Sequence, residues 1–155
     1  MEINQASPKF QDESLAPMHS AEHLLNQTMV RMFGCERSHN AHIERKKSKV
    51  NYTLQREPTP EEVAAVEQRM NEVIARDLPV TYETMNRNNL PEGVPTDRLP
   101  EGTGDTVRVV RIGDYDTCAC IGRHVARTSD IGTFRITSTS YRDGDFRIVF
   151  KLTQE

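Results

Sequence analysis

The sequence has no tryptophan, few aromatic residues and only three cysteines among its 155 residues. Cys118 and Cys120 are two positions apart and Cys35 lies far from both, which makes a poor disulfide framework and is typical of a protein from a reducing, cytoplasmic compartment. Residues 1–14 lack the apolar run of a signal peptide, and no run of about 18 apolar residues occurs in the chain. We therefore expect a cytoplasmic protein that does not enter a membrane.

A strong excess of charge of either sign is also absent. The chain has 20 Lys and Arg against 23 Asp and Glu, a net charge of −3. Hydrophobic residues make up 35% and charged residues 28%, which predicts a globular domain rather than a disordered chain. Because the protein as a whole is no polycation, any contact with nucleic acid must come from a local basic patch.

The densest basic run is a predicted turn at residues 44–49. It contains Arg45, Lys46, Lys47 and Lys49. A run of this kind can hold the phosphate backbone of an RNA, but it can equally be the solvated tip of a hairpin. The residues alone leave both interpretations open.

Apolar periodicity and capping signals predict two helices and five strands. Leu25, Met29 and Met32 repeat at helical spacing before Gly34, and Thr59, Pro60 and Glu62 form a capping box that begins the second helix. Alternating apolar residues predict the strands. The expected helices are residues 18–33 and 60–76; the expected strands are 50–54, 80–85, 106–112, 131–138 and 146–152, with a turn at 142–145, a long loop at 86–105 and a short turn or helix at 125–130.

This order of elements favours an α+β domain with helices on one side of a mostly antiparallel sheet. Residues 1–16 have little periodicity and are expected to form a lead-in or an edge strand. Residues 17–155 are expected to form a single domain. The sequence gives no indication of the oligomeric state.

Two short motifs contain candidate metal ligands. His19 and His23 are four residues apart on the first predicted helix, so one face can aim both imidazoles at one point. Cys120 and His124 have the same spacing, and the four donors suit a tetrahedral zinc site. Spacing alone also allows two surface histidines and a buried cysteine, and Cys118 is a rival ligand. The spacing of Cys35, His39 and His42 is irregular, which indicates surface or loop residues.

The segment His-Ser-Ala-Glu-His-Leu-Leu at residues 19–25 resembles the signature of the alanyl-tRNA synthetase editing domain. Residues 59–80 are similar to a helix of that family, and residues 107–136 are similar to its closing block around the cysteine and histidine. The resemblance runs from about Pro17 to Lys151 and implies zinc held by His19, His23, Cys120 and His124. It also implies a freestanding, short editing protein of the AlaX type.

Such a protein hydrolyses the ester of a mischarged tRNA, and seryl- or glycyl-tRNA for alanine is the substrate that the resemblance implies. The editing domain of threonyl-tRNA synthetase shares the two-motif plan, so the ligands do not fix the amino acid. Zinc could activate a water or orient the substrate. The alternative function is a non-catalytic, zinc-stapled module that binds RNA or protein.

Four further residues are candidates for the substrate site. Gln27 and Thr28 on the first helix are possible polar partners for a serine hydroxyl. Arg123 stands where the family prefers a small residue, and is expected to crowd or recharge the pocket. Glu22, next to His23, is a candidate general base, with an exposed surface role as the alternative.

Overall fold

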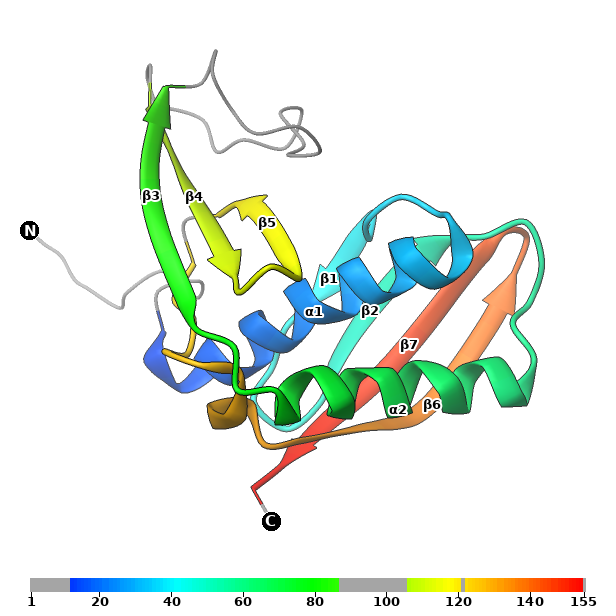
Figure 1. Ribbon diagram of the computed structural model, residues 1–155. Helices are drawn as coiled ribbons and strands as arrows, with labels where there is room; N and C mark the ends of the chain where they lie inside the picture. Colours follow the sequence, from blue (N-terminus) through cyan, green and yellow to red (C-terminus); the bar gives the residue numbers. More distant parts are fainter. Residues whose placement is uncertain (1–11, 87–105, 121, 155) are drawn as a thin grey trace, which may run out of the picture.

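The computed structural model describes residues 12–86, 106–120 and 122–154. The described residues form two long helices and two antiparallel sheets (Figure 1), which confirms the α+β class. The helices are α1 (Ala16–Phe33) and α2 (Pro60–Ala75), and the short 3-10 helices are η2 (Glu13–Leu15) and η4 (Thr128–Ile131). The strands are β1 (Asn40–His42), β2 (Ser48–Thr53), β3 (Val80–Asn86), β4 (Thr106–Ile112), β5 (Asp116–Ala119), β6 (Thr133–Arg142) and β7 (Asp145–Thr153).

The larger sheet has four strands in the order β1-β2-β7-β6. Alternate residues of its strands, such as Tyr52, Phe134 and Phe150, are buried on one face. Both helices lie on that face (Figure 1), as expected for a sheet that is apolar on one side only. This sheet and the two helices enclose most of the hydrophobic core.

Both helices lie within two residues of their predicted bounds, since α1 begins at Ala16 rather than Met18 and α2 ends at Ala75 rather than Arg76. Gly34 follows α1 with a φ of 68°, a left-handed conformation that glycine adopts without a steric cost. Thr59 accepts a hydrogen bond from the backbone N–H of Glu62, and the Glu62 side chain accepts one from the N–H of Thr59. The expected capping box is therefore present, and α2 ends one residue before the expected boundary.

The smaller sheet has three strands in the order β3-β4-β5, and none of them pairs with the larger sheet. A single sheet was expected, so this is a correction to the predicted architecture. Val110 and Ile112 on β4 belong to the same hydrophobic core as the helices, and β5 contacts α1. The smaller sheet therefore lies against α1 and covers a side of the helix that the larger sheet leaves uncovered.

Two strands were not expected from the sequence. β1 and β5 have three and four residues, too few for a period of two to be recognised. The helical turn expected at 125–130 is found slightly later, as η4. Residues 87–105 of the expected loop and residues 1–11 of the lead-in lie outside the described residues, whereas Asn86 is the last residue of β3 and residues 13–16 belong to η2 and α1. No helix in the described part of the chain is long and apolar enough to cross a membrane.

Candidate metal centre

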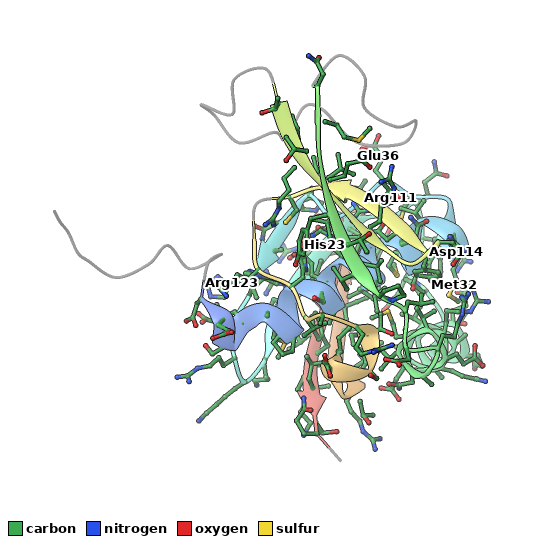
Figure 2. The ribbon with its side chains drawn as sticks, turned by 60° about the vertical axis from the view of Figure 1, so that its left-hand side comes forward. His23, Met32, Glu36, Arg111, Asp114 and Arg123 are labelled. Atoms are coloured by element: carbon green, nitrogen blue, oxygen red, sulfur yellow. The ribbon has the colours of Figure 1, made fainter. Side chains whose placement is uncertain are left out.

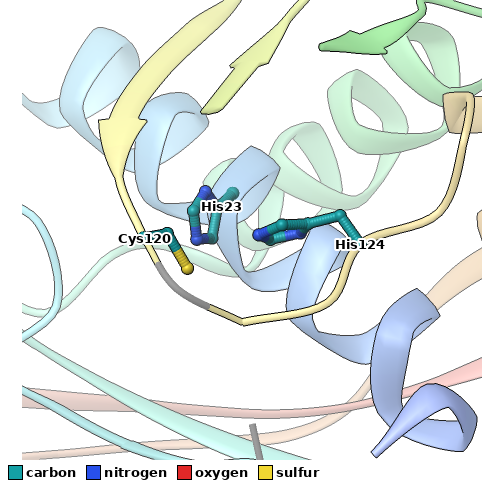
Figure 3. A group of neighbouring side chains, drawn as sticks. All are labelled: His23, Cys120 and His124. Carbon is teal, nitrogen blue, oxygen red and sulfur yellow. The ribbon is translucent and has the colours of Figure 1, made fainter. Parts of the chain in front are cut away.

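Three of the four predicted ligands come together in the structure. His23, Cys120 and His124 each offer one ligand atom, and these atoms all lie within 4.8 Å of one another. Figure 3 shows His23 reaching the cluster from α1, while Cys120 and His124 reach it from the segment that follows β5. Residues separated by most of the chain therefore meet at one point.

His23 is buried, with 6% of its surface exposed, because α1 is covered on two sides. Leu25 and Met29 face the core on one side of the helix, as the apolar spacing predicts. His23 points instead toward β5 and the segment after it. Cys120 and His124 belong to a loop rather than to a helical turn, so the four-residue spacing is satisfied by a bend at the buried Gly122.

Arg108 on β4 holds this loop. Its Nε donates to the carbonyl oxygen of Cys120 at 2.8 Å, and its Nη2 donates to the carbonyl oxygen of Gly122. The backbone N–H of Cys120 donates in turn to the carbonyl of Arg108 at 3.1 Å, and the Tyr82 ring covers the guanidinium at 4.6 Å. These contacts fix the backbone on both sides of Cys120.

A buried carboxylate lies behind His23. The Nδ1 of His23 is 3.6 Å from Oδ2 of Asp116, whose side chain is fully buried. Asp116 also accepts hydrogen bonds from Nη1 of Arg37 at 2.8 Å and from Nε2 of Gln27 at 3.0 Å. At this distance the two groups form an ion pair rather than a hydrogen bond. A carboxylate behind a histidine can still orient the ring and leave its other nitrogen free to bind a metal.

His124 is oriented by a serine. Its Nδ1 lies 3.0 Å from Oγ of Ser20, which also accepts the backbone N–H of Val125 at 3.1 Å. The Nε2 of His124 is buried and makes no hydrogen bond to any residue that the structure describes. A buried imidazole nitrogen without a hydrogen bond is costly, and a metal ion would satisfy it.

The protonation of Cys120 and His124 also suits a metal. Burial raises the pKa of Cys120, but the contact with His23 outweighs this and the pKa falls below its usual value. Burial, together with the charges of His23 and His19, lowers the pKa of His124 to about 2. Burial lowers the pKa of His23 as well, yet Asp116 and Cys120 raise it well above its usual value. A thiolate and a neutral imidazole are the forms that coordinate metals, so Cys120 and His124 are shifted toward those forms, whereas His23 must lose a proton when a metal binds.

His19, the fourth predicted ligand, lies close to the cluster but outside it. Its ring centre is 6.4 Å from that of His124, and it is not among the residues whose ligand atoms converge. His19 is one helical turn before His23, so it occupies the same side of α1. Its role as a ligand stays a prediction.

The predicted substrate residues are spread around the centre. Gln27 donates to Asp116, and Thr28 is fully buried with its hydroxyl 2.6 Å from that of Tyr115. Glu22 is half-buried on α1. Arg123 is exposed, with its Nη1 3.8 Å from Glu13, and Figure 2 shows it near the start of α1, away from His23. The structure does not bring these four side chains together, and their roles stay predictions.

The remaining sequence candidates are placed as follows. Arg45, Lys46 and Lys47 lie in the turn between β1 and β2, Lys49 lies on β2, and all four are exposed. Cys118 on β5 is not part of the converging set, and burial raises its pKa. His39 and His42 are exposed beside Asp145 and Glu44, and Cys35 packs partly against the core. The interpretation of these two histidines as surface residues is therefore confirmed.

Sequence reasoning missed the residues that support the ligands. Ser20 lies inside the first motif and Asp116 shortly before the second, but no spacing rule connects either to a histidine. Arg37 acts through Asp116, which is 79 residues away, and Arg108 acts through Cys120, which is 12 residues away. Asp116 lies on β5, which is too short to be recognised in the sequence, so no local pattern marked it.

The fold and the centre together define a small α+β domain that can hold a metal ion between a helix and a loop. Residues 107–149 match the family described as the threonyl and alanyl tRNA synthetase second additional domain. The chain is 34% identical over 137 residues to an alanine–tRNA ligase of Coxiella burnetii, a match that covers 87% of this chain and 16% of that protein. It is 37% identical to the alanine–tRNA ligase of Latilactobacillus sakei over 79% of this chain and 14% of the relative. It is 35% identical to that of Caldivirga maquilingensis over 88% and 16%.

Residues 107–149 therefore belong to the family of the threonyl and alanyl tRNA synthetase second additional domain, as the motifs indicate, and most of the chain is similar to one part of alanine–tRNA ligases. The chain spans about a sixth of the length of the relatives from Coxiella burnetii and Caldivirga maquilingensis. The membership supports a role related to tRNA editing.

Proposed function

We propose that this protein is a zinc-dependent hydrolase that deacylates mischarged tRNA in trans, with seryl-tRNA for alanine as its main substrate and glycyl-tRNA as its second. The observation that carries the proposal is the convergence of His23, Cys120 and His124 in a domain related to alanine–tRNA ligases. An enzyme that acts on aminoacyl-tRNA would work in the cytoplasm, where translation takes place.

The donor set fits zinc. Two imidazoles and a thiolate are typical zinc ligands, and His19, on the same side of α1 as His23, is the fourth candidate donor. Asp116 and Ser20 orient the two converging histidines, so the chain holds the ligands ready rather than gathering them. When bound, zinc supplies a Lewis acid that can polarise the ester carbonyl or orient the substrate.

The substrate follows from the needs of alanine selection. A hydrophobic pocket rejects an added hydroxyl by only about a hundredfold, so a synthetase for alanine needs a second site that removes serine. We assign Gln27 and Thr28 as polar partners of the serine hydroxyl, and Arg123 as the residue that borders the amino-acid pocket. Glu22 is the assigned general base.

The RNA would approach at the end of the molecule where α1 begins. The pKa of Asp12 is lowered, chiefly by hydrogen bonds from Ser14 and also by the charges of Arg45 and His19. The basic turn therefore acts electrostatically on the residue that caps η2, just before α1. Arg45, Lys46, Lys47 and Lys49 are assigned to the phosphate backbone of the tRNA.

The test is a deacylation assay with four substrates. They are alanine tRNA charged with serine, glycine or alanine, and threonine tRNA charged with threonine. Wild-type protein should release serine fastest, release glycine more slowly and largely spare alanyl-tRNA. Cys120→Ala should abolish the hydrolysis, whereas Cys35→Ala, which removes a thiol far from the centre, should retain it. Arg123→Thr puts a small residue at this position, as the family prefers, and reports on how Arg123 shapes the preference among the four substrates.

Two outcomes would contradict the proposal. Preference for a threonine-tRNA substrate would remove the assignment to serine clearance. Full zinc content without turnover on any substrate, in wild type and Arg123→Thr alike, would favour a non-catalytic module that uses the metal as a staple.

A further inference from the structure

The four-stranded sheet has a second face that no described element covers. The two helices lie on the face that buries Phe134, Phe146 and Phe150 (Figure 1). Because side chains alternate along a strand, the residues between these positions point the other way. Arg135, Arg147 and Lys151 occupy such positions and are exposed.

The register of the strands places five basic side chains on this outer face. Arg135 lies directly opposite Lys151, Arg147 lies between Asn51 and Ser140, and Lys49 lies opposite Val149. Arg142 lies opposite Asp145 at one end. Among the outward positions of the four described strands, Asp145 is the single acidic residue, and it accepts hydrogen bonds from Asn51 and contacts His39.

This concentration of positive charge contrasts with the rest of the molecule. The whole chain carries more acidic than basic residues, with a net charge of −3. Basic side chains elsewhere are mostly neutralised: Arg69, Arg76 and Arg111 each contact a carboxylate. Lys49, Arg135, Arg147 and Lys151 form no ion pair with any residue that the structure describes.

The pairing of Arg135 with Lys151 is unfavourable for the isolated domain. Like charges directly opposite on neighbouring strands destabilise a sheet, since their Cβ atoms are only about 5 Å apart. An anion bound between them removes this cost.

The outer face is also continuous with the basic turn. Ser48 pairs with Phe150, so the next residues along the two strands are Lys47 and Lys151.

We propose that the outer face of the four-stranded sheet binds the sugar-phosphate backbone of an RNA helix, with Arg135, Arg147, Lys151 and Lys49 as the phosphate-binding residues. The choice of RNA over other polyanions rests on the proposed function, in which the substrate is a tRNA. The side chains between the cations include the exposed Ser138 and Ser140, which suit hydrogen bonds to phosphate and ribose oxygens. The surface therefore positions RNA without reading its sequence, and the basic turn carries the contact around the sheet toward α1.

The experiment compares two triple variants with the same change in net charge. The first is Arg135→Gln/Arg147→Gln/Lys151→Gln on the outer face. The matched control is Arg69→Gln/Arg76→Gln/Arg111→Gln, which removes three cations that already contact carboxylates. Affinity for uncharged alanine tRNA is measured by fluorescence anisotropy over a series of salt concentrations, after circular dichroism has verified that each variant is folded.

The outer-face variant should lose at least about tenfold in affinity near 0.1 M salt, and its salt slope should fall by about two to three, one for each lost phosphate contact. The control should stay within about twofold of wild type. Equal losses in both variants, or an unchanged slope in the first, would overturn the proposal. The charge-preserving variant Arg135→Lys/Arg147→Lys should keep the wild-type slope, and a loss there would overturn it as well, because packing rather than charge would then explain the effect.

The outcome is separable from that of the deacylase proposal. Normal hydrolysis of seryl-tRNA at saturating RNA together with an unchanged salt slope would reject the surface alone. A reduced slope in the outer-face variant of a protein that hydrolyses no aminoacyl-tRNA would reject the deacylase alone.

Discussion

Asp116 shows how one buried carboxylate supports a functional side chain. It is charged in the interior because Arg37 and Gln27 donate to it and His23 lies beside it. Burial raises the pKa of Asp116, but His23 and Arg37 outweigh this and hold the pKa well below its usual range. The carboxylate is therefore ionised at every physiological pH and can orient the His23 ring.

We predict that Asp116→Asn weakens zinc binding by about 10- to 100-fold, the usual effect of removing the partner of a metal-binding histidine. The affinity is measured by competition with a chelator, on protein shown to be folded. Asp114→Asn is the control, because Asp114 is exposed two residues away and contacts only Arg76 among the described residues. Unchanged affinity in Asp116→Asn would show that His23 needs no orienting group.

At the scale of elements, α2 carries its own pH dependence in its capping box. The Arg56 guanidinium and the Thr59 N–H hold the pKa of Glu62 at about 2, below its ordinary value of 4.5. Because the pKa is lowered in the folded state, the contribution of Glu62 to stability is present above pH 4.5 and is lost as the pH falls toward 2.

The stability of Glu62→Gln should therefore decrease less than that of wild type as the pH falls through this window, since glutamine keeps the capping hydrogen bond but does not titrate. The melting temperature is followed from pH 6 to about pH 2.5. Glu61→Gln, in the same first turn but outside the capping box, should behave as wild type. Identical acid profiles for all three proteins would place the acid sensitivity elsewhere.

The turn between β1 and β2 is a second element with a predicted role. Replacing Arg45, Lys46 and Lys47 by glutamine should weaken tRNA binding and lower the salt slope by about one for each lost phosphate contact. Single-turnover hydrolysis at saturating tRNA should barely change, because the turn contributes none of the candidate metal ligands. A salt slope equal to that of wild type would remove the turn from the RNA interface.

At the scale of the whole molecule, a metal at His23, Cys120 and His124 would join α1 to the loop after β5. We predict that a chelator lowers the melting temperature of wild-type protein by about 5–10 °C, since a ligand at 100 times its dissociation constant stabilises the folded state by about 2.7 kcal/mol. Cys120→Ser should melt lower and respond less to the chelator, whereas Cys35→Ser should respond like wild type. Equal melting temperatures with and without bound metal would show that the metal is no staple.

The sequence by itself determined the elements whose causes are local. The two long helices follow from apolar spacing, Gly34 and the Thr59 capping box, and β4 follows from its alternation. The turn between β6 and β7 follows from Asp143 and Gly144, which have φ values of 51° and 85° that suit the tight turn of a hairpin. The paired motifs also indicated three side chains that meet, His23, Cys120 and His124, because their donor chemistry suits one kind of ion.

Tertiary structure alone decided how these pieces are combined. Strand pairing divides the strands into two sheets, and both β1 and β5 are too short to be recognised in the sequence. The support of His23 by Asp116 joins positions 93 residues apart, and the basic outer face exists only because the register sets Arg135 against Lys151. Capping and periodicity act over a few residues and can be recognised in the chain, whereas pairing, register and burial depend on contacts between distant segments that no local pattern encodes.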